Sequence, residues 1–313
     1  NKILSAADVD GNTALMLAAK YGDKETVEVI LERIPQGDLK NVLGAADVDG
    51  NTALMLAAAA GKKGVVEAIL AKIPQGDLKN VLGAADKDGK TALMWAAKYG
   101  DKETVEVILE RIPQGDLKNV LGAADKDGKT ALMWAVRNGN EKIVKAILAK
   151  IPPNDLKDIL SMKDMFGNNA LMLAVMKGNE KIVNAILERI PQGDKILGAA
   201  DKDGTNALIL AVNWKKEEIV QAILARIPPD DPNKILSAVD IYGTTVLMLA
   251  VRNGNEKIVK AILAKIPQED LNKILSAADV DGNTALMLAA KYGDKETVEV
   301  ILERIPQGDL KNV

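Results

Sequence analysis

One turn motif returns along the whole chain at a nearly constant interval, and it constrains the fold more than any other feature. Its glycine recurs with seven spacings, six of 39 residues and one of 37. A period of this length is typical of a repeat array, in which each unit packs mainly against its neighbours. No Ser/Gly-rich linker or change of composition interrupts the series, so we expect one domain over residues 1–313. The glycines are Gly11, Gly50, Gly89, Gly128, Gly167, Gly204, Gly243 and Gly282.

The first repeat predicts two helices and a shorter third segment. Thr13 is placed to cap a helix over residues 14–19, which are good helix formers. Asp23 caps a second helix, whose apolar residues fall three and four positions apart until Pro35 ends it. Residues 38–43 repeat the same apolar spacing and form at most a short helix.

A single repeat of this kind is too small to bury its own apolar stripe, so stability must come from stacking. The expected fold is therefore all-α: an α-solenoid of eight stacked helix-turn-helix repeats, each with a short third helix or turn. A periodic methionine column in the first helices favours core packing over an adaptable binding strip. The column is Met16, Met55, Met94, Met133, Met172, Met248 and Met287, with Ile209 in the sixth repeat. The repeats span residues about 3–41, 42–80, 81–119, 120–158, 159–195, 196–234, 235–273 and 274–312.

The string Asp-Gly-x-Thr-Ala-Leu-Met-x-Ala-Ala, followed by Gly-Asp/Asn-x-Glu-x-Val-x-x-Ile-Leu, resembles the ankyrin repeat in all eight units. Two features depart from that family. Its usual Thr-Pro-Leu-His is here Thr-Ala-Leu-Met, and the period is 39 residues instead of about 33. The resemblance implies a solenoid that binds proteins through its turn tips and the concave face of its first helices, without chemistry. A HEAT-like array tolerates the period but gives no reason for the recurrent Asp-Gly turn.

Composition excludes several other functions. The chain has no Cys and no His, so thiol nucleophiles, imidazole bases and the usual zinc ligand sets are ruled out. Lys and Arg number 41 against 44 Asp and Glu, a net charge of -3, which argues against nucleic-acid and membrane partners. No leader or long apolar span is visible, so a cytoplasmic-type location is expected. We therefore expect no enzyme activity, no cofactor and no metal.

Two patterns imitate ligand sites. Residues 83–91 and 122–130 end in Gly-Lys-Thr, but five residues separate their glycines where a phosphate-binding loop has four. The Asp-x-Asp-Gly turns suggest calcium, yet a calcium loop starting at Asp8 needs Gly at Thr13 and Glu at Ala19. Both patterns are therefore interpreted as solvated structural turns.

Aromatic residues are few, and several break the repeat pattern. Phe166 and Tyr242 replace the second aspartate of their turns, and Trp214 lies in a repeat that has lost its inter-helix glycine. These positions suit either a partner-binding patch or local packing around the irregular repeat. Trp95, Trp134 and Tyr99 lie in blocks that are copied between repeats. The candidate protein-binding residues are Met165, Phe166, Trp214, Ile241, Tyr242, Trp95, Trp134 and Tyr99.

Residues 1–42 and 272–313 are identical at all 42 positions, and neither end shows a specialised polar cap. Two complementary apolar ends form a head-to-tail contact between copies, so we expect end-to-end self-association. The internal copying favours an engineered or consensus-type scaffold. The alternative is a natural adaptor or a bacterial effector that binds a host protein through its concave face and turns.

Overall fold

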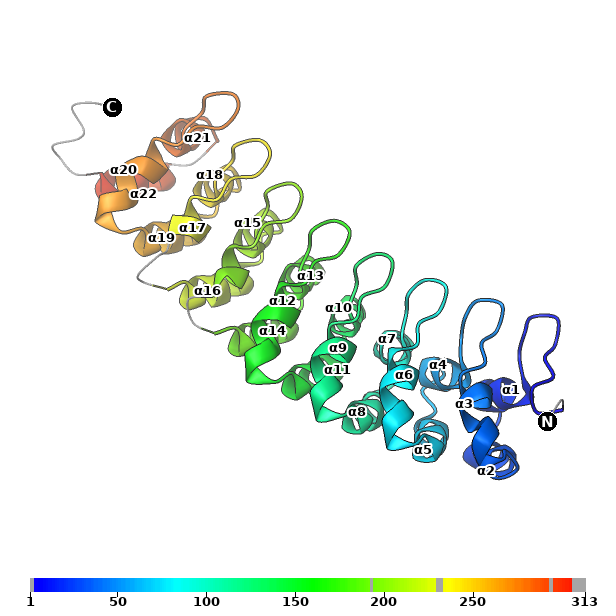
Figure 1. Ribbon diagram of the computed structural model, residues 1–313. Helices are drawn as coiled ribbons and strands as arrows, with labels where there is room; N and C mark the ends of the chain where they lie inside the picture. Colours follow the sequence, from blue (N-terminus) through cyan, green and yellow to red (C-terminus); the bar gives the residue numbers. More distant parts are fainter. Residues whose placement is uncertain (1–2, 192–193, 229–232, 293–294, 306–313) are drawn as a thin grey trace. The chain divides into compact units, whose positions relative to one another are not determined.

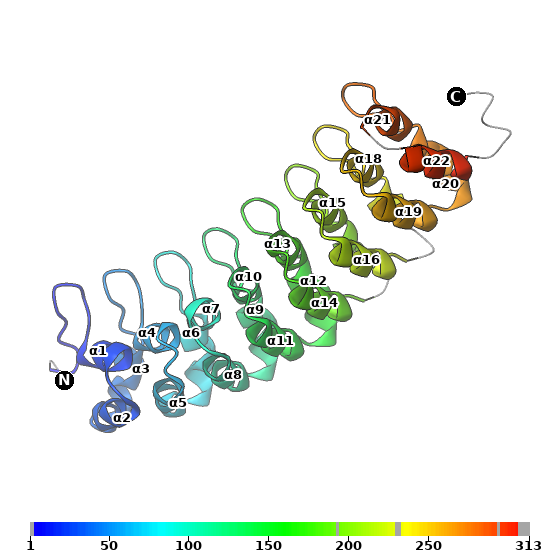
Figure 2. The same cartoon turned by 180° about the vertical axis from the view of Figure 1, so that it is seen from behind.

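The computed structural model describes residues 3–191, 194–228, 233–292 and 295–305, and the chain divides into two compact units (Figures 1 and 2). The N-terminal unit is Asn1–Met165 and the C-terminal unit is Phe166–Val313. Within the described residues every regular secondary-structure element is a helix, and β structure is limited to isolated bridges. The predicted all-α fold is therefore confirmed.

In the N-terminal unit, four repeats stack so that equivalent helices lie in rows (Figure 1). The first helices are α1 (Ala14–Tyr21), α4 (Ala53–Ala59), α7 (Ala92–Tyr99) and α10 (Ala131–Arg137). The second helices are α2 (Lys24–Glu32), α5 (Lys63–Lys72), α8 (Lys102–Arg111) and α11 (Glu141–Lys150). Each third segment is a 3-10 helix (η) followed by a short α-helix. They are η1 (Gln36–Asp38) and α3 (Leu39–Leu43), η2 (Gln75–Asp77) and α6 (Leu78–Gly83), η3 (Gln114–Asp116) and α9 (Leu117–Leu121), and η4 (Pro153–Asp155) and α12 (Leu156–Ser161).

The C-terminal unit repeats the same arrangement (Figure 2). Its first helices are α13 (Ala170–Lys177), α15 (Ala207–Asn213), α18 (Val246–Arg252) and α21 (Ala285–Tyr292). Its second helices are α14 (Glu180–Arg189), α16 (Glu217–Arg226), α19 (Glu256–Lys265) and α22 (Lys295–Arg304). Its third segments are η5 (Lys195–Gly198), α17 (Asn233–Leu236) and α20 (Gln268–Leu275).

The helix boundaries follow from local chemistry. The Thr13 hydroxyl accepts a hydrogen bond from the Met16 backbone N–H at the start of α1. The Asp23 carboxylate accepts one from the Thr26 N–H at 2.8 Å and caps α2. Pro35 then ends the second helix, and the third segment begins as a 3-10 turn before α3. The predicted caps and the short third helix are confirmed.

The core lies between successive first helices and between successive second helices. The methionine column is buried from Met16 to Met248, with exposed fractions of 0–1%, and Ile209 in the same column is 2% exposed. Its predicted packing role is therefore confirmed for these repeats. Met287 in the eighth repeat is 56% exposed, since within the described residues no repeat packs on its outer side.

Repeat six keeps its helix pair although it lacks the glycine that joins the two helices elsewhere. Four other repeats use a glycine with φ between 64° and 69° at this connection. In repeat six Lys215 takes the same left-handed conformation, with φ of 54°. A residue with a Cβ is strained in this region by about 1–2 kcal/mol, so the turn adopts a conformation that its own sequence disfavours.

Candidate protein-binding surface

Each repeat projects a turn segment beside its first helix, and we call the segment equivalent to residues 7–13 a finger. In seven fingers the leading aspartate accepts hydrogen bonds from the backbone N–H groups two and four residues later. For Asp8 these bonds reach Asp10 and Asn12, at 3.0 and 2.8 Å. The following glycine takes a φ between 69° and 88° in all eight fingers. This chemistry holds these seven fingers in one shape.

Neighbouring fingers are also joined by a backbone hydrogen bond that the sequence did not reveal. In each pair, the residue after the leading aspartate donates its N–H to a carbonyl in the preceding finger. The bonds run from Val48 to Asp10 (2.8 Å), Lys87 to Asp49 (2.8 Å), Lys126 to Asp88 (2.8 Å), Met165 to Asp127 (2.7 Å), Lys202 to Phe166 (3.1 Å), Ile241 to Asp203 (2.9 Å) and Val280 to Tyr242 (2.9 Å). The fingers within each unit therefore form a fixed row.

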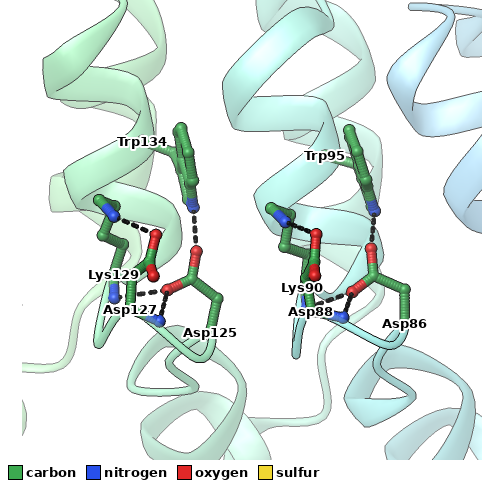
Figure 3. Close-up of polar contacts among 8 residues, drawn as sticks. All are labelled: Asp86, Asp88, Lys90, Trp95, Asp125, Asp127, Lys129 and Trp134. Carbon is green, nitrogen blue, oxygen red and sulfur yellow. Dashed lines mark hydrogen bonds and ion pairs between the residues drawn. The ribbon is translucent and has the colours of Figure 1, made fainter.

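The third and fourth repeats carry tryptophan where the other six have leucine. The indole N–H of Trp95 donates to Asp86 Oδ2 at 2.9 Å, and that of Trp134 donates to Asp125 Oδ2 at the same distance (Figure 3). Each indole is thus tied to the finger of its own repeat. Both rings are half-buried and lie in the same orientation on α7 and α10 (Figure 3).

A lysine near the end of each of these two fingers packs under the tryptophan. Lys90 and Lys129 are only 9% and 4% exposed, and their amines lie 5.5 and 5.4 Å from the indole ring centres. Each amine binds the second finger aspartate at 2.6 Å, Asp88 and Asp127 respectively (Figure 3). The expectation of a fully solvated Gly-Lys-Thr turn is therefore wrong for these side chains. The turns are structural, but their lysines are buried in ion pairs beneath the indoles.

At Lys90, charge pairing outweighs the effect of burial on the pKa of the amine. Burial lowers the pKa of Lys90, but the hydrogen bond to Asp88 and the attraction of Asp88 and Asp86 outweigh it, so its pKa lies above the usual 10.5. The hydrogen bond from Lys90 likewise lowers the pKa of Asp88 below 3.8. Both groups stay charged at neutral pH, and the finger keeps its ion pair.

Two further cations lie against the indoles on the first helices. The Lys98 amine lies 5.3 Å from the Trp95 ring centre, 4.6 Å from that of Tyr99 and 4.5 Å from that of Trp134. The Arg137 guanidinium lies 5.7 Å from the Trp134 ring centre. Such distances are typical of cation–π contacts. Trp95 and Tyr99 also stack, with ring centres 5.6 Å apart.

The structure brings together three of the eight candidate residues, namely Trp95, Tyr99 and Trp134. We call them, with Lys98 and Arg137, the aromatic-basic cluster. Sequence reasoning missed both cations and the buried finger lysines. One signal was available, since lysine four residues after the leading finger aspartate and tryptophan five residues later occur together in these two repeats and nowhere else.

The other candidates are exposed. Met165 in the N-terminal unit is 50% exposed. In the C-terminal unit Phe166, Ile241 and Tyr242 are 57–61% exposed, and Trp214 is 53% exposed. The finger between those of Phe166 and Tyr242 carries Lys202 and Asp203, so charged residues separate the two apolar fingers. Trp214 follows the C-terminal end of α15, a seven-residue helix about 10 Å long. The length of this helix therefore separates it from the finger of its repeat.

The described residues contain neither a metal-ligand cluster nor a membrane-spanning helix. Within them, no group of three His, Cys, Asp or Glu side chains is arranged to hold a metal ion. Across the same part of the chain, no helix combines the length and the apolar character that crossing a bilayer requires.

The fold and this surface define a helical repeat module. A family model described as ankyrin repeats (three copies) matches residues 1–80, 74–158, 153–235 and 227–312. The chain belongs to the ankyrin repeat family, which decides against the HEAT-like interpretation. Modules of this family serve as scaffolds for protein–protein interaction and are generally non-catalytic.

The comparison with solved structures agrees on the fold. The crystal structure of the ankyrin repeat domain of Bcl-3, described as a unique member of the IkappaB protein family, superposes with a TM-score of 0.65. The two chains share 22% identity, and the match covers 81% of this chain and 99% of the other. Identity at this level shows a common fold alone. No curated protein sequence matches the chain.

Proposed function

We propose that this chain is a non-catalytic scaffold that binds a protein partner through its fingers and first helices. One observation carries the proposal. Nearly all the large hydrophobic side chains exposed in the described residues lie on fingers or on first helices and their ends, and the exceptions are Ile3, Val29 and Leu302. Exposed apolar groups gathered on one kind of surface mark interaction sites in soluble proteins. They are Val9, Leu17, Tyr21, Val48, Tyr99, Met165, Phe166, Met176, Trp214, Val239, Ile241, Tyr242, Val280, Met287 and Tyr292.

A partner screen tests this proposal. The immobilised chain is expected to retain one protein from cell lysate, and that protein should bind again when purified. Replacing Phe166, Trp214 and Tyr242 together by Ala should weaken its binding by about tenfold or more, because exposed aromatic anchors carry much of an interface's energy. A control triple variant, Glu67→Ala, Glu106→Ala and Glu256→Ala, changes second helices only. Equal binding by all three forms would contradict the proposal.

The internal copies support an engineered or consensus-type origin for this scaffold. Residues 18–47 recur without change as residues 96–125, and residues 135–152 recur as residues 250–267. Identity of this extent reaches exposed positions that stacking does not constrain. The alternative proposal is a natural adaptor or a bacterial effector that binds a host protein on the same surface.

The two outer repeats favour a second candidate function, head-to-tail association between copies of the 313-residue chain. Leu17 in the first repeat is 40% exposed, whereas its counterpart Leu288 in the last repeat is 3% exposed. The opposite holds for the methionine column, where Met16 is 1% exposed and Met287 is 56% exposed. Because the two repeats have the same sequence, these differences arise only from which neighbour is missing.

The two bare faces match an interface that already exists inside the N-terminal unit. Residues 8–19 and 47–58 have the same sequence as residues 279–290, so finger and first helix are shared by all three repeats. The last repeat of one copy can therefore pack against the first repeat of another as α1 packs against α4. The Val9 N–H would then donate to the Asp281 carbonyl of the other copy, as Val48 donates to Asp10 at 2.8 Å.

Complementation of two blocked variants tests this association. Leu17→Glu places a charge on one face and Met287→Glu places a charge on the other, and burial of an unpaired charge is unfavourable by several kcal/mol or more. Each variant alone should sediment as a monomer at concentrations where the wild type associates, and an equal mixture should form dimers. Association of either variant alone, or a wild type that stays monomeric at its highest soluble concentration, would contradict the proposal.

A further inference from the structure

We propose that the aromatic-basic cluster binds an extended acidic segment of a partner protein. This inference rests on the proposed binding function and names the chemistry of the partner. The cluster joins aromatic surface to cations in two adjacent repeats, α7 carrying Lys98 and α10 carrying Arg137 at the equivalent position.

The cluster is rigid before any partner arrives. Each indole is held by its bond to a finger aspartate at 2.9 Å, and each finger is held by the backbone bond to its neighbour. The buried amines of Lys90 and Lys129 support the indoles from the finger side. A surface already fixed in its bound form loses little conformational entropy on binding. Little of the binding energy is then lost to ordering of the cluster.

The charge of this surface differs from that of the preceding repeats. Over finger and first helix, residues 86–100 and residues 125–139 each carry three cations against two carboxylates, a net charge of +1. Residues 8–22 carry one cation against two carboxylates, and residues 47–61 carry two carboxylates alone. The cluster is thus the basic part of this surface in the N-terminal unit. Complementary charge favours a partner that is acidic.

The spacing of the cations suits an extended chain. Lys98 and Arg137 occupy equivalent positions one repeat apart, and stacked helices are separated by about 8–10 Å. In an extended segment, two carboxylates two residues apart lie on the same face and are separated by about 7 Å, and the long Lys and Arg side chains can span the remaining difference. One carboxylate then reaches each cation, and the methylene groups of the acidic side chains contact the indole edges.

The same surface is poorly suited to single-stranded nucleic acid, although protein sites for single strands also combine aromatic rings with cations. Base stacking needs open ring faces, but the Lys98 amine lies within 5.3 Å of three ring centres. The carboxylates of Asp88 and Asp127 are 70% and 52% exposed beside the indoles. Phosphate groups would meet these charges at each repeat, whereas a protein segment can place an apolar or polar residue there.

Fluorescence anisotropy with a defined probe tests the proposal on the full chain. The probe is a fluorescein-labelled decapeptide of alternating Glu and Leu, and its control has Gln in place of Glu. Changing Lys98→Glu together with Arg137→Glu should weaken binding of the acidic peptide by about tenfold or more. The matched control changes Lys20→Glu and Arg252→Glu, which are the equivalent residues in repeats whose first helices have leucine in place of tryptophan. This control should bind within about twofold of the wild type, since it makes the same charge change elsewhere.

A second variant tests the aromatic part. Changing Trp95→Leu together with Trp134→Leu installs the residue that six repeats already use, so the fold is retained while the indole edges are lost. Binding of the acidic peptide should again fall by about tenfold. Three outcomes would each overturn the inference. The wild type would bind the Gln peptide as tightly as the acidic peptide, the Lys20→Glu and Arg252→Glu control would lose as much affinity as the cluster variant, or the wild type would bind oligothymidylate more tightly than the acidic peptide. If the peptide fails while a partner retained through Phe166, Trp214 and Tyr242 persists, the inference falls and the proposed function stands.

Discussion

Replacing Met94 by Ala is expected to destabilise the protein by about 2–5 kcal/mol, whereas the same change at Met287 should cost about 0.5 kcal/mol. The two residues hold the same position in their repeats, and their neighbours along the helix differ only at Trp95 and Leu288. Met94 is 1% exposed and Met287 is 56% exposed. Removing Met94 therefore leaves a cavity between α7 and its neighbours, while removing Met287 leaves a surface that was already open to water.

Urea unfolding followed by circular dichroism measures both variants, and hydrogen exchange localises the effect. A repeat array need not unfold in a single step, so amides of α7 and α8 provide the local readout for Met94→Ala. They should exchange faster, while amides of α13 and α14 should change much less. Equal loss of stability in the two variants would show that stacking does not provide the core as described above.

The fold could be predicted because its determinants are local and occur eight times. Thr13, Asp23 and Pro35 fix the start of the first helix and both ends of the second through side chains that act within a few residues. A period of 39 residues then requires the units to stack. Lys215 shows the limit of this reasoning. Its left-handed conformation is the one that glycines adopt at the same connection in four other repeats, and no local preference of lysine indicates it.

The candidate surface could be predicted less well, because its contacts join residues that are distant in sequence. The sequence marks Trp95 and Trp134 as unusual for the repeat, but it does not show that Lys98 reaches the indole of the next repeat at 4.5 Å. Lys129 would be expected in water, yet it is 4% exposed. Its burial depends on an indole five residues away and on an ion pair with Asp127, and neither follows from helix periodicity.

Replacing Gly128 by Ala is expected to destabilise the protein by about 2–4 kcal/mol, because two independent effects act on one finger. The first is conformational, since Gly128 has a φ of 77°, where a Cβ is strained by about 1–2 kcal/mol. The second is steric, since the added Cβ would lie 2.8 Å from the Lys163 carbonyl oxygen and 3.1 Å from the Asp164 Cα. Both are backbone atoms, so the finger of the next repeat must move.

The matched control is Gly282→Ala in the last repeat. Gly282 has a φ of 79°, but nothing lies within 4 Å of its added Cβ, so only the conformational strain of about 1 kcal/mol remains. The difference between the two variants in urea unfolding therefore measures how much the close contact between fingers contributes. Hydrogen exchange of the Met165 amide, which donates to Asp127 at 2.7 Å, should accelerate in Gly128→Ala and stay unchanged in Gly282→Ala. If the two variants were equally stable, the fingers would be independent turns, and the rigid support that the aromatic-basic cluster requires would be absent.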